Sequence, residues 1–452
     1  MVRSPFDPDR RLDRGVWWWF REFMGNIFLD YDPDQSLLFP PSPREWLPEN
    51  HLAWFVSDAV EALDLRELFR SYRPGGKGNL AYHPKLLLKL LIYGYSIGVF
   101  SSRKIAKQIE ENVAFRVLAA GQFPNHRTIC RFREHHIEQF SELFAQIVQM
   151  AKEAGLVKLG TIAIDGTKVN ANASKHKAMS YERMKEEEKR LRDEIRKIAA
   201  IAAGQDAAED AEFGPDFRGD ELPEELRRRE TRRAAIRAAK KRLEERKAQE
   251  AAAKQPESPV DREQARPDPK DQENFTDPDS RIMKASSGAF EQAYNAQISV
   301  DSAKQIIVAT GVTQSAADAK QLIPMVDETM AITEEKPGKV LADAGYRSEE
   351  NFRQLENRQI EGFVPLAREG KAPNAQPSRP ASARMKRRLD SKRGRARYKM
   401  RKYLVEPVVG WIKQVLGFRV FSLRGFTKVT GEWNLVCLAL NLRRMSRMMS
   451  FA

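Results

Sequence analysis

The chain has 452 residues, of which 41% are hydrophobic, so it is long enough for two or three domains with a sizeable buried core. Two cysteines are too few for a disulfide framework, and the apolar run at 16–20 is cut by Arg21 and Glu22, far short of a membrane span. We therefore expect a cytoplasmic protein with no signal peptide and no membrane contact.

The positive charge of the chain is unevenly distributed. There are 77 Lys and Arg residues against 63 Asp and Glu, a formal charge of +14, and residues 368–452 alone hold 21 basic and 4 acidic residues. The excess is therefore a C-terminal patch, which favours a polyanion such as DNA or RNA because cationic side chains neutralise phosphates and release counterions. A basic solvated tail is the alternative.

The N-terminal third of the chain predicts an arm and a helical domain. Prolines are frequent in residues 1–49, which favours an extended arm with one short aromatic helix around 17–28. Residues 50–157 predict helices, because apolar side chains between Leu86 and Tyr95 recur at spacings of three and four.

Three short helical segments within this domain, 101–110, 112–120 and 124–136, have the outline of a helix-turn-helix. The last of them would present three arginines to a DNA groove: Arg127, Arg131 and Arg133. A plain helical bundle is the alternative. The histidines and the cysteine of this segment match no standard spacing of zinc ligands.

Residues 176–274 predict a charged helical insertion. Tyr181 to Lys254 holds 20 basic and 19 acidic residues, interleaved at helical spacings. We expect two long helices, about 178–203 and 222–254, joined by a stretch that contains Asp, Gly and Pro. A solvated spacer and an arm that grips DNA or a second subunit are both compatible with this composition.

Strands return after the insertion. Runs at 290–300 and 305–312 predict a hairpin. They are followed in order by a helix at 316–330, a strand that ends at Asp343, a helix at 348–357 and a short strand at 360–365. Together with the strand before Asp165, this order predicts a mixed sheet with helices packed on it.

The C-terminal part predicts a basic linker and two helices. Residues 371–402 are rich in Pro, Ser and Ala and then in Lys and Arg, which predicts a linker. Four apolar residues then follow at spacings of four, three and four and predict one buried stripe: Leu404, Val408, Trp411 and Val415. Residues 432–449 predict an apolar packing helix with a basic end.

Three acidic residues are candidate metal ligands. Asp165 ends the apolar run of LGTIAIDGTKVN (159–170), Asp343 ends that of GKVLADAGY (338–346), and Glu406 lies in a helical segment. Aspartates at the ends of neighbouring strands share one cleft, and a helix packed across the sheet could add the glutamate. Carboxylates suit Mg²⁺ or Mn²⁺, and two such ions roughly 3.5–4 Å apart support in-line phosphoryl transfer.

The alternative is that Asp165 and Asp343 only cap strand ends. Three other aspartates are placed outside the site, in the hairpin or on a helix: Asp301, Asp318 and Asp327.

Several blocks, in this order, resemble the DDE transposases of bacterial insertion sequences: IDGTK (164–168), TDPDSRIM (276–283), YNAQISVD (294–301), LADAGYRSEEN (341–351) and VEPVVGWIK (405–413). The segments at 82–105 and 126–136 are similar to the helical domain that precedes the catalytic core in one branch of that family. These blocks span most of residues 50–445.

The resemblance implies an RNase H-like catalytic domain, of the α+β or α/β class, formed by residues 158–175 and 275–452. It implies a triad of Asp165, Asp343 and Glu406, two Mg²⁺ or Mn²⁺ ions, and hydrolysis that frees a DNA 3′-hydroxyl for transfer into target DNA. The expected partners are the terminal inverted repeats of the element and target DNA, bound by a homodimer in the bacterial cytoplasm, in association with the nucleoid.

Relatives place a tyrosine, an arginine and a lysine around the glutamate, and the candidates for DNA contact here are Tyr398, Arg401, Lys402 and Lys413. Arg401 precedes Glu406 by five residues where the commoner pattern has four, and Lys402 occupies the four-residue position. The sequence therefore leaves open which of the two meets the terminal phosphate. Two alternatives to a transposase also stay open: a metal-dependent nuclease that never joins strands, and a sequence-specific DNA-binding protein that has no catalytic activity.

Overall fold

The computed structural model describes residues 42–72, 81–213, 224–254, 266–285, 288–367 and 379–449. The expected N-terminal arm up to residue 41, with its aromatic helix, lies outside these residues. The chain divides into two compact units, Met1–Trp46 and Leu47–Ala452, and the second contains all elements discussed below. Within the described ranges no helix combines the length and the apolar character that a bilayer crossing requires.

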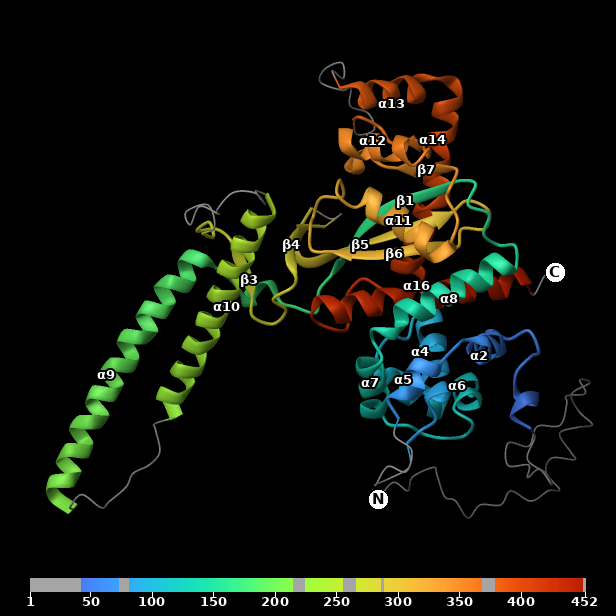
Figure 1. The fold of residues 1–452 in the computed structure, drawn as a ribbon. Helices are drawn as coiled ribbons and strands as arrows, with labels where there is room; N and C mark the ends of the chain where they lie inside the picture. The colour runs from blue at the N-terminus through green and yellow to red at the C-terminus, as the bar shows by residue number, and fades with distance from the viewer. Residues whose placement is uncertain are drawn as a thin grey trace, which may run out of the picture. The chain divides into compact units, whose positions relative to one another are not determined.

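The N-terminal part of the larger unit is helical, as the apolar spacing predicted (Figure 1). Its helices are α2 (Leu52–Ala62), α3 (Arg66–Arg70), α4 (Pro84–Ser96), α5 (Ser102–Glu111), α6 (Val113–Leu118), α7 (His126–His135) and α8 (Gln139–Glu153). Side chains that accept from the first backbone N–H groups start several of them, such as Asn112 before α6 and Asn125 before α7. The three short segments of the predicted helix-turn-helix are therefore helices α5, α6 and α7.

A six-stranded mixed sheet forms the second part. Its strands are β1 (Ile162–Asn170), β4 (Arg281–Lys284), β5 (Phe290–Asp301), β6 (Ile307–Thr313), β7 (Lys339–Ala342) and β8 (Glu361–Phe363). The order is β4-β5-β1-β7-β8, with β6 paired to the C-terminal half of β5. Strand β1 is antiparallel to β5 over its whole length and parallel to β7, so the predicted mixed sheet is confirmed. Strand β4 was not predicted.

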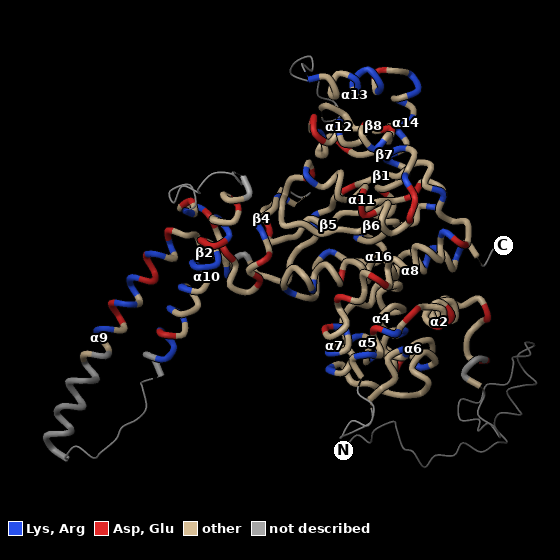
Figure 2. The backbone as a smooth tube through the Cα atoms, in the orientation of Figure 1, with Lys and Arg blue, Asp and Glu red and all other residues tan. Residues whose placement is uncertain are grey.

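Helices follow the strands along the chain: α11 (Leu322–Thr333), η3 (Ala344–Tyr346), α12 (Glu349–Asn357), α13 (Pro380–Asp390), α14 (Lys392–Leu404), α15 (Glu406–Gly410), the π-helical segment η4 (Trp411–Val415) and α16 (Phe426–Met449). Helices α12, α13 and α14 pack on β8, and α14 also contacts β7; Figure 2 labels all five elements. Helix α16 packs on β6 and also on α2, α4 and α8, so it joins the sheet to the N-terminal helices.

The structure corrects three expectations of the sequence analysis. Helix α11 begins at Leu322 rather than at 316, so the residues before it form a loop. The expected basic linker contains helices α13 and α14, each of which buries part of one face, for example Met385. The predicted apolar stripe fails at Val415, which is 58% exposed, because the wider turn of the π-helix shifts the phase and buries Ile412 instead.

The insertion leaves and rejoins the sheet domain through a two-stranded sheet of β2 (Ala178–Ser180) and β3 (Gln272–Asn274). Between them lie α9 (Tyr181–Phe213), which runs ten residues beyond its expected end, and α10 (Glu224–Lys254). A small apolar cluster that includes Met184, Leu191 and Ile236 lies between the two helices. Figure 2 shows basic and acidic residues interleaved along the coloured parts of both helices. Because the apolar cluster is small, ion pairs such as Lys240 with Glu188, 2.7 Å apart, supplement it.

A buried polar network joins the N-terminal helices to α16. The carboxylate of Glu432, which has no exposed surface, accepts from the Tyr95 hydroxyl at 2.9 Å and from the backbone N–H groups of Ser422 and Leu423 at 2.9 and 3.1 Å. Arg133 donates to the same Tyr95 hydroxyl at 2.8 Å. Burial of Glu432 and Tyr95 is tolerated because both are hydrogen-bonded, whereas the Nε of Arg133 is buried without a hydrogen-bond partner.

We expect Glu432→Ala to lower the free energy of unfolding by about 3–5 kcal/mol, because it leaves buried donors without an acceptor and a buried arginine without its counter-charge. Urea denaturation measures the effect. The control is Glu67→Ala on the exposed pair with Arg70, which should change stability by less than about 0.5 kcal/mol. Equal effects of the two substitutions would contradict a structural role for the network.

The stability of the N-terminal helices should depend on pH through His136. This ring is 1% exposed and stacks on Tyr72, and burial, with His135 adding to it, lowers its pKa from 6.5 to about 4. The unfolded chain takes up a proton near pH 6.5 whereas the folded chain does not, so stability present above pH 6.5 is lost as the pH falls towards 4. We expect a loss of up to about 3 kcal/mol.

Urea denaturation at pH 7 and pH 4.5 should show that His136→Phe flattens this dependence, while His176→Phe at an exposed position leaves it unchanged. If His136→Phe lost as much stability at low pH as the wild type, the pH dependence of stability would come from other groups.

Candidate active site

The parallel pairing of β1 and β7 brings two of the predicted acids together. The last paired residues are Ile164 and Ala342, and the next residue on each strand is the aspartate, Asp165 or Asp343. The chain turns after Asp343, whose carboxylate accepts from the N–H of Gly345 at 2.7 Å and caps η3. Asp343 therefore does act as a cap, although of η3 rather than of a strand end, and the same turn also holds it beside Asp165.

Arg401 links the third acid to the first. One terminal nitrogen of its guanidinium lies 3.3 Å from the Asp165 carboxylate, and the other lies 3.0 Å from that of Glu406. Arg401 is 9% exposed, whereas the Glu406 side chain is half exposed. Glu406 therefore lies on the same side of the sheet as Asp165, at the distance that one guanidinium spans.

A break between two helices sets the position of Glu406. Helix α14 ends at Leu404, and α15 starts at Glu406 with Pro407 in its first turn, where a missing N–H costs nothing. The break places residues that are five apart, Arg401 and Glu406, on the same side. Beyond it, the Nζ of Lys413 donates to the carbonyl of Lys168 on β1 at 2.7 Å and fastens η4 to the sheet.

The electrostatics of the site show a deficit of positive charge. Burial raises the pKa of Asp165 to about 6, and the neighbouring Asp343 adds to this rise although Arg401 counteracts it. The pKa of Arg401 is raised in spite of its burial, because Asp165, Tyr398 and Glu406 favour the charged form. The pKa of Lys413 is lowered by burial and by Lys168.

The donor set of the site suits a divalent cation. Carboxylate oxygens are the hard ligands that Mg²⁺ and Mn²⁺ prefer, and a buried carboxylate whose pKa is raised beside a second one is stabilised by added positive charge. In the described part of the chain, no three Asp, Glu, His or Cys side chains lie close enough together to hold an ion. The guanidinium of Arg401 lies between Asp165 and Glu406, so a cation bound by both would need Arg401 to move aside.

The structure separates the residues that were predicted to contact DNA. Arg127 and Arg131 are exposed on α7. Arg133 is only 4% exposed and is bound to Tyr95 and to the carbonyl of Phe100, because it lies on the buried face of α7. It therefore cannot reach a groove from this position, and the expectation for Arg133 is corrected. Tyr398 hydrogen-bonds to Arg401 beside the acids.

Of the two candidates near Glu406, Arg401 faces the acids, whereas Lys402, the next residue of α14, is exposed.

Sequence analysis excluded one residue that the structure brings to the site. Asp318 was placed on a helix, but it lies in the loop before α11, where its carboxylate accepts from Lys168, Asn295 and Gln297. Pro324 indicates from the sequence that Asp318 lies before the helix. Proline is favoured in the first turn, so the helix begins only shortly before residue 324. The glycines that follow Asp165 and Asp343 are a second indication, because they leave space near the acids for another side chain.

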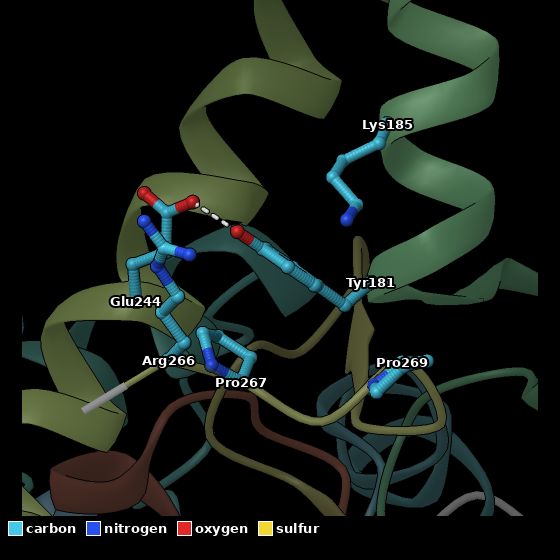
Figure 3. A pocket seen from close by; sticks show the side chains of 6 residues that line it. All are labelled: Tyr181, Lys185, Glu244, Arg266, Pro267 and Pro269. Carbon is cyan, nitrogen blue, oxygen red and sulfur yellow. Dashed lines mark hydrogen bonds between the residues drawn. The ribbon is translucent and has the colours of Figure 1, made fainter. Parts of the chain in front are cut away.

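A separate cavity of about 530 Å³ lies in the insertion, where α9 and α10 meet the segment before β3 (Figure 3). The Tyr181 hydroxyl donates to Glu244 at 2.6 Å, and the Lys185 ammonium lies 5.0 Å from the Tyr181 ring centre. The other lining residues are Arg266, Pro267 and Pro269. None of these residues belongs to the acid site, so the cavity carries no part of its chemistry.

Two family matches cover much of the chain. Residues 41–135 match a family described as transposase domain (DUF772), and residues 257–442 match one described as transposase DDE domain. The second match includes Asp343, Glu406 and five of the six strands of the sheet, all those that follow the insertion. Neither the curated proteins nor the solved structures include a significant match.

We expect Gly166→Ala to destabilise the site, since a Cβ there would lie 2.3 Å from the Gln297 amide nitrogen and 2.6 Å from an Asp318 carboxylate oxygen. Overpacking of this kind should lower the free energy of unfolding by about 1–3 kcal/mol in urea denaturation. Gly160→Ala is the matched control, because its Cβ would meet no atom within 4 Å. A Gly166→Ala protein as stable as the control would show that the site can relax.

Proposed function

The chain belongs to the DDE transposases of bacterial insertion sequences, and from that premise we propose that Asp165, Asp343 and Glu406 catalyse metal-dependent cleavage at element ends and transfer of the freed strand into target DNA. The DDE domain has the RNase H-like fold, a mixed sheet flanked by helices. DNA is the substrate that this family membership implies.

One observation carries the proposal. The parallel pairing of β1 with β7 sets Asp165 beside Asp343, and Arg401 joins Glu406 to the same site. Two carboxylates that are far apart in sequence thus lie side by side after paired strands, and the third, at a helix start, is linked to the first through Arg401. A capping role alone would not explain why a buried arginine spans two of them.

We propose that the three acids would hold two Mg²⁺ or Mn²⁺ ions, whose positive charge would favour an in-line phosphoryl displacement. Asp165 and Asp343 would be the common ligands, since they are already adjacent. Glu406 would complete the set once Arg401 releases it, which the exposure of its side chain favours.

The basic residues of this site are suited to hold the scissile phosphate. A guanidinium offers a planar fork of donors that matches phosphate oxygens as well as carboxylates, so Arg401 could exchange Asp165 and Glu406 for a DNA phosphate. Tyr398 and Lys413 flank it and would contact the same strand. In the metal-free protein Arg401 partly neutralises the acids and so keeps the site folded.

The remaining DNA would lie along the exposed basic side chains of α14, a helix without any acidic residue, which Figure 2 shows as a blue segment beside β7 and β8. Arg127 and Arg131 on α7 would contribute to the recognition of element ends. Two copies of the chain bound to a pair of ends are part of the proposal, and the mass of the protein–DNA complex in solution tests this stoichiometry.

The central test uses purified protein with element-end DNA, a target plasmid and Mg²⁺. Asp165→Ala, Asp343→Ala and Glu406→Ala should each reduce strand joining by at least about 10³-fold, or roughly 4 kcal/mol of barrier, and EDTA should abolish it. Asp327→Ala, which removes an exposed partner of Arg358, is the matched control and should join at the wild-type rate.

Cleavage without joining would mean that the protein is a nuclease rather than a transposase. Binding without cleavage, unchanged in all variants, would leave a DNA-binding protein without catalytic activity.

Substitutions at Arg401 and Lys402 should have different effects. Arg401→Ala should reduce joining by about 10–100-fold, because it removes the group that faces both acids. Lys402→Ala should reduce joining by less than about threefold, weaken DNA binding and lower the salt slope of log K by about 1, as loss of one phosphate contact does. If Lys402→Ala reduced joining more than Arg401→Ala, Lys402 would be the residue that acts at the site and Arg401 the one that only binds DNA.

A further inference from the structure

Asp165 and Asp343 each have a glycine shortly after them, and the side chain of Asp318 lies close to both glycines. A Cβ at Gly166 would lie 2.6 Å from Oδ1 of Asp318, and a Cβ at Gly345 would lie 3.3 Å from Oδ2 of the same residue. The latter Cβ would also lie 2.9 Å from the carboxylate of Asp343. The carboxylate of Asp318 therefore occupies the space that side chains at both positions would need.

The carboxylate of Asp318 is held by donors from two strands. Oδ1 accepts from the side-chain amides of Asn295 at 2.6 Å and Gln297 at 2.9 Å, both on β5 and fully buried. The ammonium of Lys168 on β1 lies 3.4 Å away. The Asp318 side chain is 20% exposed, so it lies at the edge of the site rather than within the core.

Hydrogen bonds fix the loop that carries Asp318 to its neighbours on two sides. Asn351 on α12 donates its amide to the carbonyl of Ala319 at 2.6 Å and to that of Tyr346 at 2.7 Å, which ties the loop to η3. Asn295 also donates to the carbonyl of Ser315 at 3.1 Å. The hydroxyl of Tyr346 in turn donates to Gln297, one of the amides that hold Asp318. The loop, β5 and η3 thus form one hydrogen-bonded unit beneath the two aspartates.

We propose that Asp318 is a positioning residue of the acid site, which fixes the separation of Asp165 and Asp343 by filling the space between Gly166 and Gly345. Its charge adds to the negative field of the two aspartates and so favours a divalent cation there. The inference rests on the proposed function, because it assigns Asp318 to the same metal-dependent site. Asp318 itself need not touch DNA or metal.

The test measures Mn²⁺ binding to the full chain by calorimetric titration, which does not depend on catalytic turnover. Asp318→Asn keeps the shape of the side chain and removes its charge. We expect it to weaken Mn²⁺ binding by about 10–100-fold, the usual effect of losing a group that orients metal ligands. Asp165→Ala, measured in parallel, should remove the site.

The control is Asp301→Asn. Asp301 is also a buried aspartate of the sheet domain, but its carboxylate accepts from the backbone of Leu159 and Ala303 at the other end of β5. It should cost stability in urea and change Mn²⁺ affinity by less than about threefold. If Asp318→Asn does not fold, Gly345→Ala keeps both carboxylates and should displace them, with the same loss of Mn²⁺ affinity.

Mn²⁺ affinity within threefold of wild type in folded Asp318→Asn would overturn the inference, and so would an equal loss in Asp301→Asn. These results leave the proposed function standing if the wild type joins DNA. Weakened Mn²⁺ binding in Asp318→Asn, together with a wild type that never joins DNA, would support the inference and sink the proposed function instead. A wild type that takes up no Mn²⁺ overturns both.

Discussion

The parallel pairing of β1 with β7 is the constraint on which the active site depends. Neighbouring strands of a sheet lie about 5 Å apart, so two aspartates at equivalent positions on them are forced together whatever the intervening chain does. Here that chain includes the whole insertion, three further strands and α11, yet the register at Ile164 and Ala342 places Asp165 next to Asp343. Burial raises the pKa of Asp165 to about 6 and the charge of Asp343 adds to this rise, so positive charge at this point stabilises the ionised carboxylate.

Arg401 supplies positive charge to Asp165 and links the sheet to the C-terminal helices. Arg401 comes from α14, and its two contacts span β1 and the first residue of α15. The break between these helices and the π-helical segment after them are irregularities in an otherwise helical stretch. Such irregularities are frequent at functional sites, where they change the direction in which side chains point. Here they set Glu406 towards the acids and Lys413 towards β1.

The insertion and the N-terminal helices relate to the sheet in different ways. The insertion enters and leaves through the β2–β3 pair, and its two helices are held together by a small apolar cluster and many ion pairs. The N-terminal helices instead share one hydrophobic core with the sheet domain, from Ala53 to Met445. The buried carboxylate of Glu432 adds a polar link between the N-terminal helices and α16.

The sequence by itself determined the mixed sheet and most of its strands, though not β4, α13 or α14, and it singled out Asp165 and Asp343, because apolar runs that end in a carboxylate are local signals. Only the tertiary structure decided which charged side chains share a site. It buried Arg133, chose Arg401 over Lys402 as the residue that faces the acids, and brought Asp318 from an expected helix to the acid pair. Those outcomes depend on helix phase and on contacts between residues hundreds of positions apart, which hydrophobic periodicity does not encode.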